Sequence, residues 1–289
     1  MVGQVHLLKK YGVRVRGHLG QHLLMDPNTV RKIVDALDLE NGETILEVGP
    51  GLGALTSEIL SRGHRVIAVE KDPKFIEILE AEVGPHFPGL LEVIPGDVLD
   101  CDLTKIINKF SPTNTRCLTP GVGRGGKVVS NLPYYISTPI LFHLIDHREC
   151  FHSAVLMMQK EVAARMTAKP RTKDYGRLSV SSSLFGTAET LFDVSPKCFL
   201  PAPEVTSRVI RFTFNHAPSA GDETFLPELI RIAFCERRKT LLSLLLKYLK
   251  PKRERPEIES AFEKLGLSSK VRGEELTTGQ FKALAQALK

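Results

Sequence analysis

The sequence predicts an α/β domain with a seven-stranded, mostly parallel sheet, followed by a small all-α domain. Three observations support this prediction. Short apolar runs alternate with helical segments over most of the chain, a glycine-rich turn follows the first of these runs, and the last part shows no strand pattern. Nearly continuous apolar strands separated by helices are typical of a parallel sheet that is covered on both faces.

Five apolar runs make up the parallel part of the predicted sheet. They are TILEV at 44–48, RVIAVE at 65–70, LEVI at 91–94, KVVS at 127–130 and AVLMMQ at 154–159. The spacing of apolar residues predicts helices over 28–39, 54–62, 73–83 and 138–146. The first helix should end at Asn41-Gly42, a pair that favours a turn. The alternation is the strand–helix–strand pattern of a parallel sheet.

Two later runs, AETLFDV at 188–194 and SRVIRFTF at 207–214, predict a hairpin at the sheet edge because their link is short and proline-rich. The polar stretch 215–223 predicts a linker. The helical pattern that follows covers 226–234, 239–249, 257–266 and 278–288. We therefore expect a catalytic domain over 1–217 and a helical domain over 218–289. The sequence suggests no purpose for the loop 111–126.

The charge distribution favours a polyanionic partner without proving one. The chain has 289 residues and a net charge of +6, and its composition is ordinary for a soluble globular protein. Residues 1–25 contain four cations and no acid, and residues 237–255 contain eight cations and one acid. Such concentrated segments fit a phosphate-contacting surface. The candidate residues for such a surface are Arg237, Arg238, Lys239, Lys252 and Arg253.

Other classes of function find little support in the composition. The five cysteines lie far apart and form no CxxC pair, so we expect no metal site. Their odd number and the charged N-terminal segment point to reduced thiols in the cytoplasm. No apolar run approaches the ~20 residues of a membrane helix, so we expect no membrane partner.

The glycine turn EVGPGLGALT at 47–56 follows a strand and opens a helix, as a nucleotide-binding turn must. Gly49, Gly51 and Gly53 allow the backbone to approach a ligand closely. Glu70 ends the next strand, 21 residues after Gly49, where a carboxylate can accept both hydrogen bonds of a ribose diol. The spacing GxGxG differs from the GxGxxG of NAD enzymes. A purely structural glycine turn is the alternative.

Asp97, in GDVL at 96–99, follows the third strand beside this turn. Its carboxylate could accept a hydrogen bond from an adenine amino group, because ligands of such folds bind at the carboxyl ends of strands. Aspartate also favours helix caps and turns, so a structural role is the alternative.

Asn131-Leu132-Pro133-Tyr134 directly follows the strand KVVS. The lone pair of an adenine amine is delocalised into the ring, so this nitrogen is a poor nucleophile. Two acceptors bound to its N–H groups would make the lone pair more available, and the Asn131 side-chain oxygen and the Leu132 carbonyl can be those acceptors. Pro133 stiffens the turn, and Tyr134 offers a face for a base taken out of its stack. The alternative is a plain proline turn.

With these motifs, the sequence strongly resembles the small-subunit ribosomal RNA adenine dimethyltransferase family. NLPYYISTP at 131–139 resembles its catalytic motif. Other blocks match nearly the whole chain, including LGQHLLMDPN (19–28), MMQKEVAARM (157–166), FLPAPEVTSRVIRF (199–212) and AFCERRKTLLSLL (233–245). The resemblance implies the Rossmann-like fold of class I methyltransferases, with S-adenosyl-L-methionine as cofactor. It implies cofactor contacts by Gln21, His22, Leu24, Gly49, Gly51, Glu70, Asp97, Val98 and Asn131.

The catalytic residues that the resemblance implies are Asn131, Leu132, Pro133, Tyr134 and Phe199, the last facing the target base opposite the tyrosine. The implied reaction is N6,N6-dimethylation of two adjacent adenosines in a hairpin near the 3′ end of small-subunit rRNA. The implied partner is an immature small ribosomal subunit, met by a monomer in the cytoplasm. Leu23 and Glu236 depart from the usual Phe and Gln of the family, which affects details of RNA contact.

Three other functions are left open by the sequence. The related macrolide-resistance methyltransferases act on large-subunit RNA, but their motif typically reads NIPY and they lack the RRKTL helix. A DNA adenine methyltransferase would carry a large target-recognition region, which this sequence lacks. A binding protein of ribosome assembly or of transcription is the third, against which the complete set of cofactor residues argues. The basic loop at 169–177 could also contact RNA.

Overall fold

The computed structural model describes residues 3–15, 17, 20–40, 42–110, 125–216, 225–249 and 254–288. The chain divides into two compact units. The first comprises Met1–Ala163 with Thr187–His216, and the second comprises Ala164–Gly186 with Ala217–Lys289.

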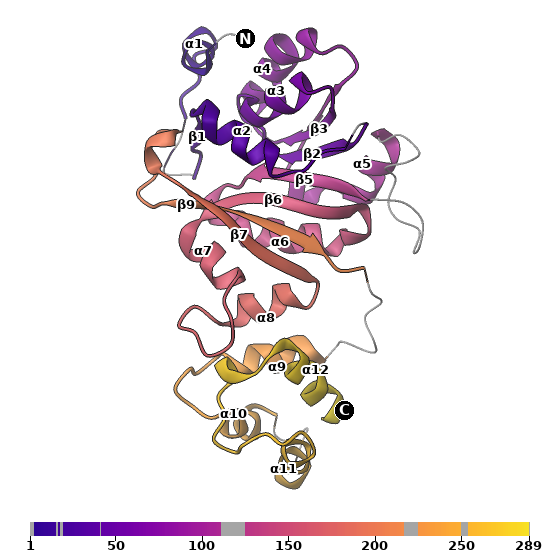
Figure 1. The fold of residues 1–289 in the computed structure, drawn as a ribbon, viewed down its shortest axis with the longest axis vertical. Helices are drawn as coiled ribbons and strands as arrows, with labels where there is room; N and C mark the ends of the chain where they lie inside the picture. Colours follow the sequence, from indigo (N-terminus) through magenta and orange to yellow (C-terminus); the bar gives the residue numbers. More distant parts are fainter. Residues whose placement is uncertain are drawn as a thin grey trace. The chain divides into compact units, whose positions relative to one another are not determined.

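The first unit is built on a seven-stranded sheet with the strand order β4-β3-β2-β5-β6-β9-β7 (Figure 1). The strands are β2 (Thr44–Val48), β3 (Arg65–Glu70), β4 (Leu91–Pro95), β5 (Gly126–Asn131), β6 (Phe151–Gln159), β7 (Gly186–Val194) and β9 (Ser207–Phe214). The pairs from β4 to β6 are parallel, and β9 runs antiparallel to β6. The predicted sheet is confirmed, and β7 and β9 are neighbours at its edge, where the hairpin was expected.

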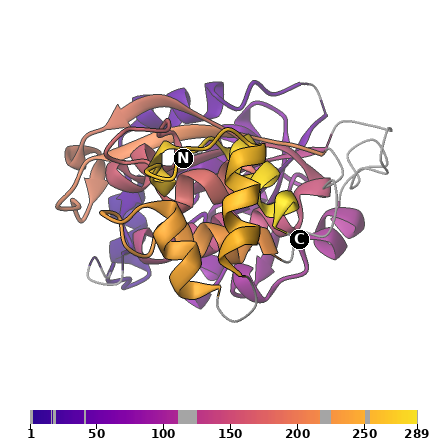
Figure 2. The same ribbon diagram turned by 90° about the horizontal axis from the view of Figure 1, so that it is seen from below.

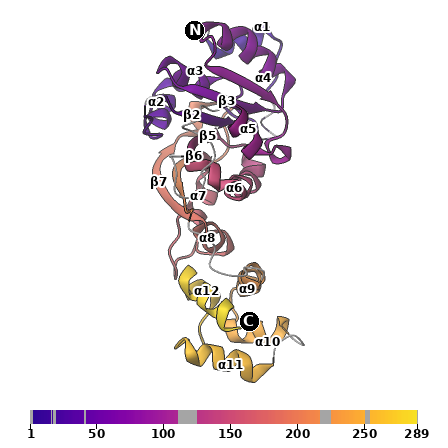
Figure 3. The same ribbon diagram turned by 90° about the vertical axis from the view of Figure 1, so that its right-hand side faces the viewer.

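Helices cover both faces of this sheet, as its apolar strands require. They are α2 (Pro27–Asp35), α3 (Ala54–Ser61), α4 (Pro73–Ile78), α5 (Leu103–Phe110) and α6 (Ser137–Asp146). Figure 3 shows α2 and α3 on one side of the sheet and α5 and α6 on the other. The predicted apolar face of the first helix, Val30, Ile33, Val34 and Leu37, is buried against α3 and the sheet. All five residues of β2 are buried too, which is why the strand shows no polar alternation.

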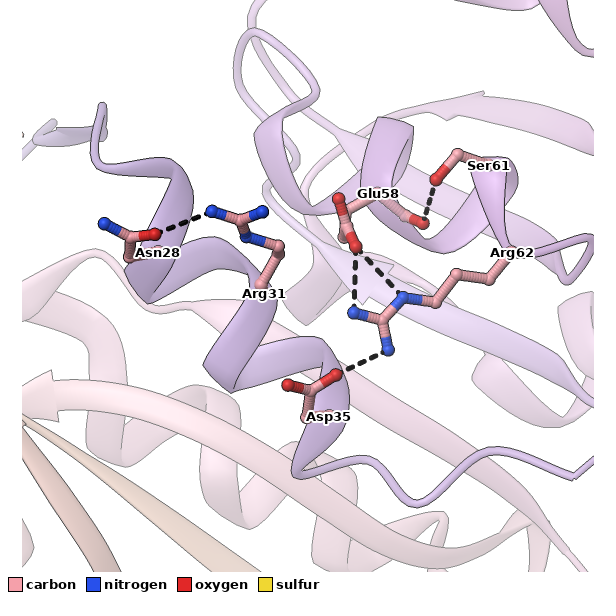
Figure 4. Close-up of polar contacts among 6 residues, drawn as sticks. All are labelled: Asn28, Arg31, Asp35, Glu58, Ser61 and Arg62. Atoms are coloured by element: carbon pink, nitrogen blue, oxygen red, sulfur yellow. Dashed lines mark hydrogen bonds and ion pairs between the residues drawn. The ribbon is translucent and has the colours of Figure 1, made fainter.

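Helices α2 and α3 are joined mainly by apolar packing, with a polar network at their surface (Figure 4). The Arg62 guanidinium contacts the Glu58 carboxylate at 2.8 Å and the Asp35 carboxylate of α2 at 2.8 Å. Exposed ion pairs of this kind contribute about 0–1 kcal/mol. The buried cluster below them therefore supplies most of the stabilisation.

Three short elements near the N-terminus and the sheet edge were not predicted. They are α1 (Gln4–Lys10), β1 (Leu23–Leu24) and β8 (Phe199–Leu200). Strands β1 and β8 form an antiparallel ladder of their own, in which Leu23 opposes Leu200 and Leu24 opposes Phe199. The Met25 N–H extends this ladder by donating to the Cys198 carbonyl at 2.7 Å. The ladder holds residues 20–24 at the carboxyl edge of the main sheet.

The second unit is helical in its described part, as predicted. Its helices are α8 (Arg177–Ser183), α9 (Phe225–Ala233), α10 (Leu241–Tyr248), α11 (Arg255–Lys264) and α12 (Thr278–Ala287), while α7 (Lys160–Met166) spans the division between the units. Figure 2 shows α9 to α12, in orange to yellow, gathered around one another. Their apolar faces enclose one cluster that includes Leu229, Leu241, Ile258 and Phe281.

The division between the units differs from the predicted domain boundary. Residues 164–186 were assigned to the catalytic domain, whereas the structure groups them with the C-terminal helices. The reason is tertiary packing, because Tyr175 and Val180 are buried in the cluster of the second unit. The Tyr175 hydroxyl also donates to the Leu276 carbonyl at 2.7 Å. The predicted boundary itself, at 217/218, and most of the loop 111–126 lie outside the described residues.

Cys101, Cys198 and Cys235 are free thiols among the described residues. Over the described ranges, no group of three or more His, Cys, Asp and Glu residues is arranged to hold a metal ion. No helix in the same ranges is long and apolar enough to cross a membrane.

Candidate active site

A pocket open to solvent lies at the carboxyl ends of β2, β3 and β5. The residues that line it come from the N-terminal segment, the glycine turn, β3, α4 and the turn after β5. They are Gln4, Gly20, Gln21, His22, Leu23, Leu24, Glu47, Gly49, Pro50, Gly51, Leu52, Ala54, Leu55, Glu70, Phe75, Asn131, Leu132, Pro133 and Tyr134.

The glycine turn forms one wall of the pocket. Gly49 and Gly51 have φ angles of 65° and 57°, in the left-handed region that side chains with a Cβ rarely adopt. A Cβ at Gly49 would meet no protein atom within 4 Å, so the backbone is open to a ligand there. The Gly51 N–H donates to the Glu70 carboxylate at 3.1 Å, which ties the turn to the end of β3.

Glu70 is buried, with 8% of its surface exposed, and its carboxylate is fixed by the backbone. One oxygen accepts from the N–H groups of Lys71 and Asp72 at 2.8 and 2.9 Å, and the other accepts from Gly51. Burial raises the pKa of this carboxyl, and the three backbone hydrogen bonds oppose that shift. An ionised carboxylate accepts about four hydrogen bonds, so Glu70 keeps capacity for a ligand hydroxyl.

Glu47 lies beside Glu70 in the pocket wall and is 1% exposed. Burial, with a smaller contribution from the Glu70 charge, raises the pKa of the Glu47 carboxyl to about 8, although a hydrogen bond from Thr56 opposes the shift. That hydrogen bond, from the Thr56 hydroxyl to Oε2, is 2.6 Å long. Glu47 is therefore largely protonated at neutral pH.

Asn131 ends β5 at the opposite wall. Its side-chain Nδ2 donates to the His22 carbonyl at 2.8 Å, which fixes the orientation of the amide. Among the described residues, no donor bonds its Oδ1, which is thus available as an acceptor in the pocket. His22 is anchored in turn, because its Nδ1 bonds the Pro201 carbonyl at 2.8 Å. The N-terminal segment and the turn after β5 therefore hold each other in place.

The residues after Asn131 are equally constrained. The Leu132 N–H donates to the Met157 carbonyl at 3.0 Å, and the Leu132 side chain is buried. The Tyr134 hydroxyl bonds the Ser207 hydroxyl of β9, and the Tyr134 ring lies 5.3 Å from the His22 ring, tilted by 30°. Burial raises the pKa of the Tyr134 hydroxyl, which therefore stays neutral. The hydrogen bond to Ser207 and the packing against His22 therefore fix the Tyr134 side chain without a ligand.

Comparison with known proteins assigns the chain to a family. The sequence profile described as ribosomal RNA adenine dimethylase matches residues 12–288. The chain belongs to this family. The fold and the class of enzyme that the sequence implied, a class I rRNA adenine dimethyltransferase, are thereby confirmed.

Named relatives of this dimethylase agree. It is 38% identical to "Ribosomal RNA small subunit methyltransferase A" of Geobacillus sp. (strain WCH70) over 98% of this chain and 94% of that protein. It is 39% identical to the protein of the same name from Geobacillus thermodenitrificans, over 98% of this chain and 94% of that protein. Among solved structures, a dimethyladenosine transferase from Plasmodium falciparum has a TM-score of 0.74 and 26% identity, covering 91% of this chain and 96% of that one. The 23S rRNA methyltransferase ErmE, 23% identical, covers 92% and 99% with a TM-score of 0.65 and shares the fold.

The dimethylase brings most of the predicted site residues together, but not Asp97 and Val98, which do not line the pocket. Asp97 caps a short helix, since its Oδ1 accepts from the Leu99 N–H at 3.0 Å. Its Oδ2 contacts the Lys71 ammonium at 2.8 Å, and that hydrogen bond is the main reason why the pKa of Asp97 is lowered. Asp97 therefore has the capping role that was the alternative reading of the sequence. Its contact with a cofactor stays a prediction.

Phe199 also lies apart from the pocket wall of the dimethylase. It is 5% exposed and shares a hydrophobic cluster with Leu24, its partner in the β1–β8 ladder. Its backbone thereby supports the segment that lines the pocket. Contact between Phe199 and a target base stays a prediction, and in this structure the side chain is covered.

The basic residues of the C-terminal unit have two different environments. The Arg237 guanidinium donates to the Lys173 carbonyl at 2.7 Å and lies 3.4 Å from the Glu274 carboxylate. Arg238 and Lys239 are exposed. Lys252 and Arg253 lie outside the described residues. Arg237 thus has a contact within the second unit, and contact of Arg237, Arg238 and Lys239 with RNA stays a prediction.

Sequence reasoning assigned no role to several residues that line the pocket of this dimethylase, among them Glu47, Phe75 and Gln4. Glu47 lies in the glycine motif, and the sequence analysis gave it no role. An acid in an otherwise apolar strand could have indicated a functional residue. Phe75 follows the acidic end of β3, where an apolar residue could have been expected beside a ligand. Gln4 carried no signal, because it lies on a seven-residue helix with no strong pattern.

Gly49→Ala should weaken cofactor binding more than it weakens the fold. The left-handed φ costs an alanine about 1–2 kcal/mol of folding free energy. The added methyl group would also stand in the ligand space, and we expect affinity for S-adenosylhomocysteine to fall about tenfold or more. Gly63→Ala is the matched control, because Gly63 has a φ of 83°, open surroundings and no place in the pocket. Equal losses of affinity in both variants, by calorimetric titration, would contradict the assignment.

Proposed function

We propose that this dimethylase transfers methyl groups from S-adenosylmethionine to N6 of two adjacent adenosines in a hairpin near the 3′ end of small-subunit rRNA. The observation that carries the proposal is the hydrogen bond between Asn131 Nδ2 and the His22 carbonyl. It leaves the Asn131 oxygen as an acceptor inside a pocket whose other wall carries Gly49 and Glu70.

The pocket residues fit an S-adenosylmethionine molecule. The open space beside Gly49 lets the chain approach a ligand, and Glu70 can accept the hydrogen bonds of a ribose diol. Leu52, Leu55 and Phe75 supply apolar surface next to these polar groups. When bound, S-adenosylmethionine supplies an electrophilic methyl group on its sulfonium. We assign the remaining cofactor contacts to Gln21, His22 and Leu24, which line the same pocket.

Asn131 and Leu132 would activate the target amine by accepting its hydrogen bonds. The Asn131 Oδ1 and the Leu132 carbonyl can each take one N–H, which makes the nitrogen lone pair more available for transfer. Tyr134, neutral and fixed by Ser207, offers its ring to the extruded adenine. No strong general base is required, because the methylated amine loses its proton readily. Fixed placement of the reacting groups then supplies much of the rate.

The substrate that we propose is an immature small ribosomal subunit, which this chain would meet as a monomer in the cytoplasm during ribosome biogenesis. The names of its relatives refer to the small subunit. The net charge of +6 and the exposed cations Arg238 and Lys239 support binding to a polyanion. We propose the helical C-terminal unit as the RNA-binding part, with Lys252 and Arg253 as further contacts.

Charge reversal at Arg238 and Lys239 should weaken subunit binding and reduce its salt dependence. Each phosphate contact that is lost lowers the slope of log K against log salt by about 0.7–0.9. Filter binding at several salt concentrations measures this slope. Lys264→Glu, which reverses an exposed cation outside the basic segments, is the control and should leave the slope unchanged. Arg237 is not reversed, because its loss would disturb the contact with Lys173. An unchanged slope in the double variant would refute this RNA-binding surface.

The proposed reaction is tested with tritiated S-adenosylmethionine and immature small subunits, followed by nucleoside analysis and mapping of the rRNA. We expect N6,N6-dimethyladenosine at two adjacent positions of the small-subunit rRNA. Large subunits are assayed in parallel. Absence of dimethyladenosine, or its formation in large-subunit RNA alone, would overturn the proposal. An Asn131→Ala variant that binds subunits without methylating them would separate binding from catalysis.

A further inference from the structure

Tyr135 is an exposed aromatic residue beside the pocket that the reaction does not use. It lies on the short helix Tyr134–Ile136, directly after the tyrosine of the pocket wall. Its relative exposure is 68%, whereas Tyr134 is largely covered and bonded to Ser207. Lone exposed apolar residues are common on proteins and need no explanation. The surroundings of Tyr135 make it different.

The Tyr135 ring is seated on a glycine. A Cβ placed on Gly20 would lie 2.8 Å from Tyr135 Cδ1, so the ring rests directly against the Gly20 backbone. Gly20 has a φ of 73° and itself lines the pocket. The ring is therefore held at the pocket mouth in a defined place, and it exposes the rest of its surface to solvent. A preplaced ring loses little conformational freedom when it binds.

A cation and a second apolar side chain lie close by. Lys71, directly after β3, lies within electrostatic range of Tyr135, and its ammonium contacts the Asp97 carboxylate at 2.8 Å. The Lys71 side chain is 75% exposed. Leu200, 39% exposed, opposes Leu23 in the ladder next to the Gly20 segment. An aromatic face with a neighbouring ammonium is the combination that binds a nucleotide, whose base stacks while its phosphate meets the cation.

We propose that Tyr135 is a stacking platform for the nucleotide next to the target adenosine. This inference rests on the proposed function and names a part of the substrate site for it. When one adenosine enters the pocket beside Tyr134, the chain of the RNA places its neighbour within one nucleotide of Tyr135. The base of that neighbour stacks on the exposed ring, and Lys71 contacts the adjoining phosphate. Each of the two target adenosines thus stacks on Tyr135 while the other is methylated in the pocket.

The inference is tested by removing the ring and the base separately and together. Small subunits are reconstituted with rRNA that contains either the natural adenosine pair or an abasic site in place of one adenosine. Wild-type, Tyr135→Ala and Tyr135→Phe enzymes are assayed for dimethylation of the other adenosine. Base–aromatic stacking is usually strong enough for its loss to change binding roughly 5- to 100-fold. The affinity for S-adenosylhomocysteine is measured on each enzyme to report on the pocket and the fold.

We expect Tyr135→Ala to raise KM on natural subunits by roughly 5- to 100-fold, with a much smaller change in kcat. Tyr135→Phe keeps the ring and should restore most of the affinity. On abasic subunits, wild-type and Tyr135→Ala enzymes should have the same KM, because the partner of the ring is gone. Affinity for S-adenosylhomocysteine should be the same in all three enzymes.

The possible failures are distinguishable. A wild-type enzyme that forms no dimethyladenosine on natural subunits overturns the proposed function and this inference with it. An active wild type with an unchanged KM in Tyr135→Ala overturns the platform alone. The same holds if Tyr135→Ala raises KM equally on natural and abasic subunits, because the ring would then contact something other than the neighbouring base. Loss of S-adenosylhomocysteine binding in Tyr135→Ala would assign the ring to the pocket instead and also overturn the platform.

Discussion

Replacing Asn131 with alanine is expected to lower kcat for adenosine dimethylation about 10²- to 10³-fold. The change removes the oxygen that would accept a hydrogen bond from the target amine, and preorganised hydrogen-bonding groups at a reacting centre contribute rate factors of this size. It also removes the hydrogen bond to the His22 carbonyl, which orients the amide. The rate is measured in single turnovers with saturating S-adenosylmethionine and small subunits.

Asn131→Asp separates these two contributions. Its carboxylate retains an acceptor oxygen, but the oxygen that replaces Nδ2 would face the His22 carbonyl at the present 2.8 Å and be repelled. We therefore expect kcat to be low in this variant as well. Asn28→Ala is the matched control, because Asn28 is exposed on α2 and lies outside the pocket. If Asn131→Ala kept more than about a tenth of the wild-type kcat, the acceptor mechanism would be wrong.

Glu47 should make the free energy of unfolding fall as the pH rises between about 4.5 and about 8. Its pKa in the folded protein is about 8, against 4.5 for an ordinary glutamate. Between these values the folded state keeps a proton that the unfolded state has lost, so raising the pH favours unfolding. The contribution is absent below about pH 4.5 and complete above about pH 8. One pKa unit corresponds to about 1.4 kcal/mol, so the effect can reach several kcal/mol.

Glu47→Gln should remove this pH dependence, because a glutamine has the same shape and can still accept the Thr56 hydrogen bond without ionising. The variant and the wild type should be similarly stable at pH 5, and the variant should be the more stable one at pH 8. Denaturation of the cofactor-free protein across this range measures the difference. Glu47→Asp keeps an ionisable group and should retain a pH dependence. Parallel curves for wild type and Glu47→Gln would show that Glu47 is ionised in the folded protein.

Much of the fold and the centre of the site could be predicted from the sequence because they depend on local patterns. The strands of the main sheet are short apolar runs, and Gly49, Glu70 and Asn131 each follow such a run. Strands of a parallel sheet place their carboxyl ends at one edge, so residues that end different strands meet there. Local order along the chain was sufficient to bring these residues together.

The remaining parts depend on contacts between distant residues. A two-residue ladder such as Leu23–Leu24 with Phe199–Leu200 has no periodicity to detect. Residues 164–186 join the second unit through the buried Tyr175 and Val180, which no local pattern reveals. Arg237 was predicted as a phosphate ligand, and the contact of its guanidinium with the Lys173 carbonyl could not be read from the sequence. Asp97 could have been either cap or ligand, and the choice depends on where Lys71 and Leu99 lie.

The β1–β8 ladder builds the mouth of the pocket from two stretches that lie far apart in the sequence. His22 and Leu24 touch the ligand space, yet their position depends on Phe199, Leu200 and Pro201, which do not. Exchanging either stretch between relatives without the other would therefore disturb the walls of the pocket.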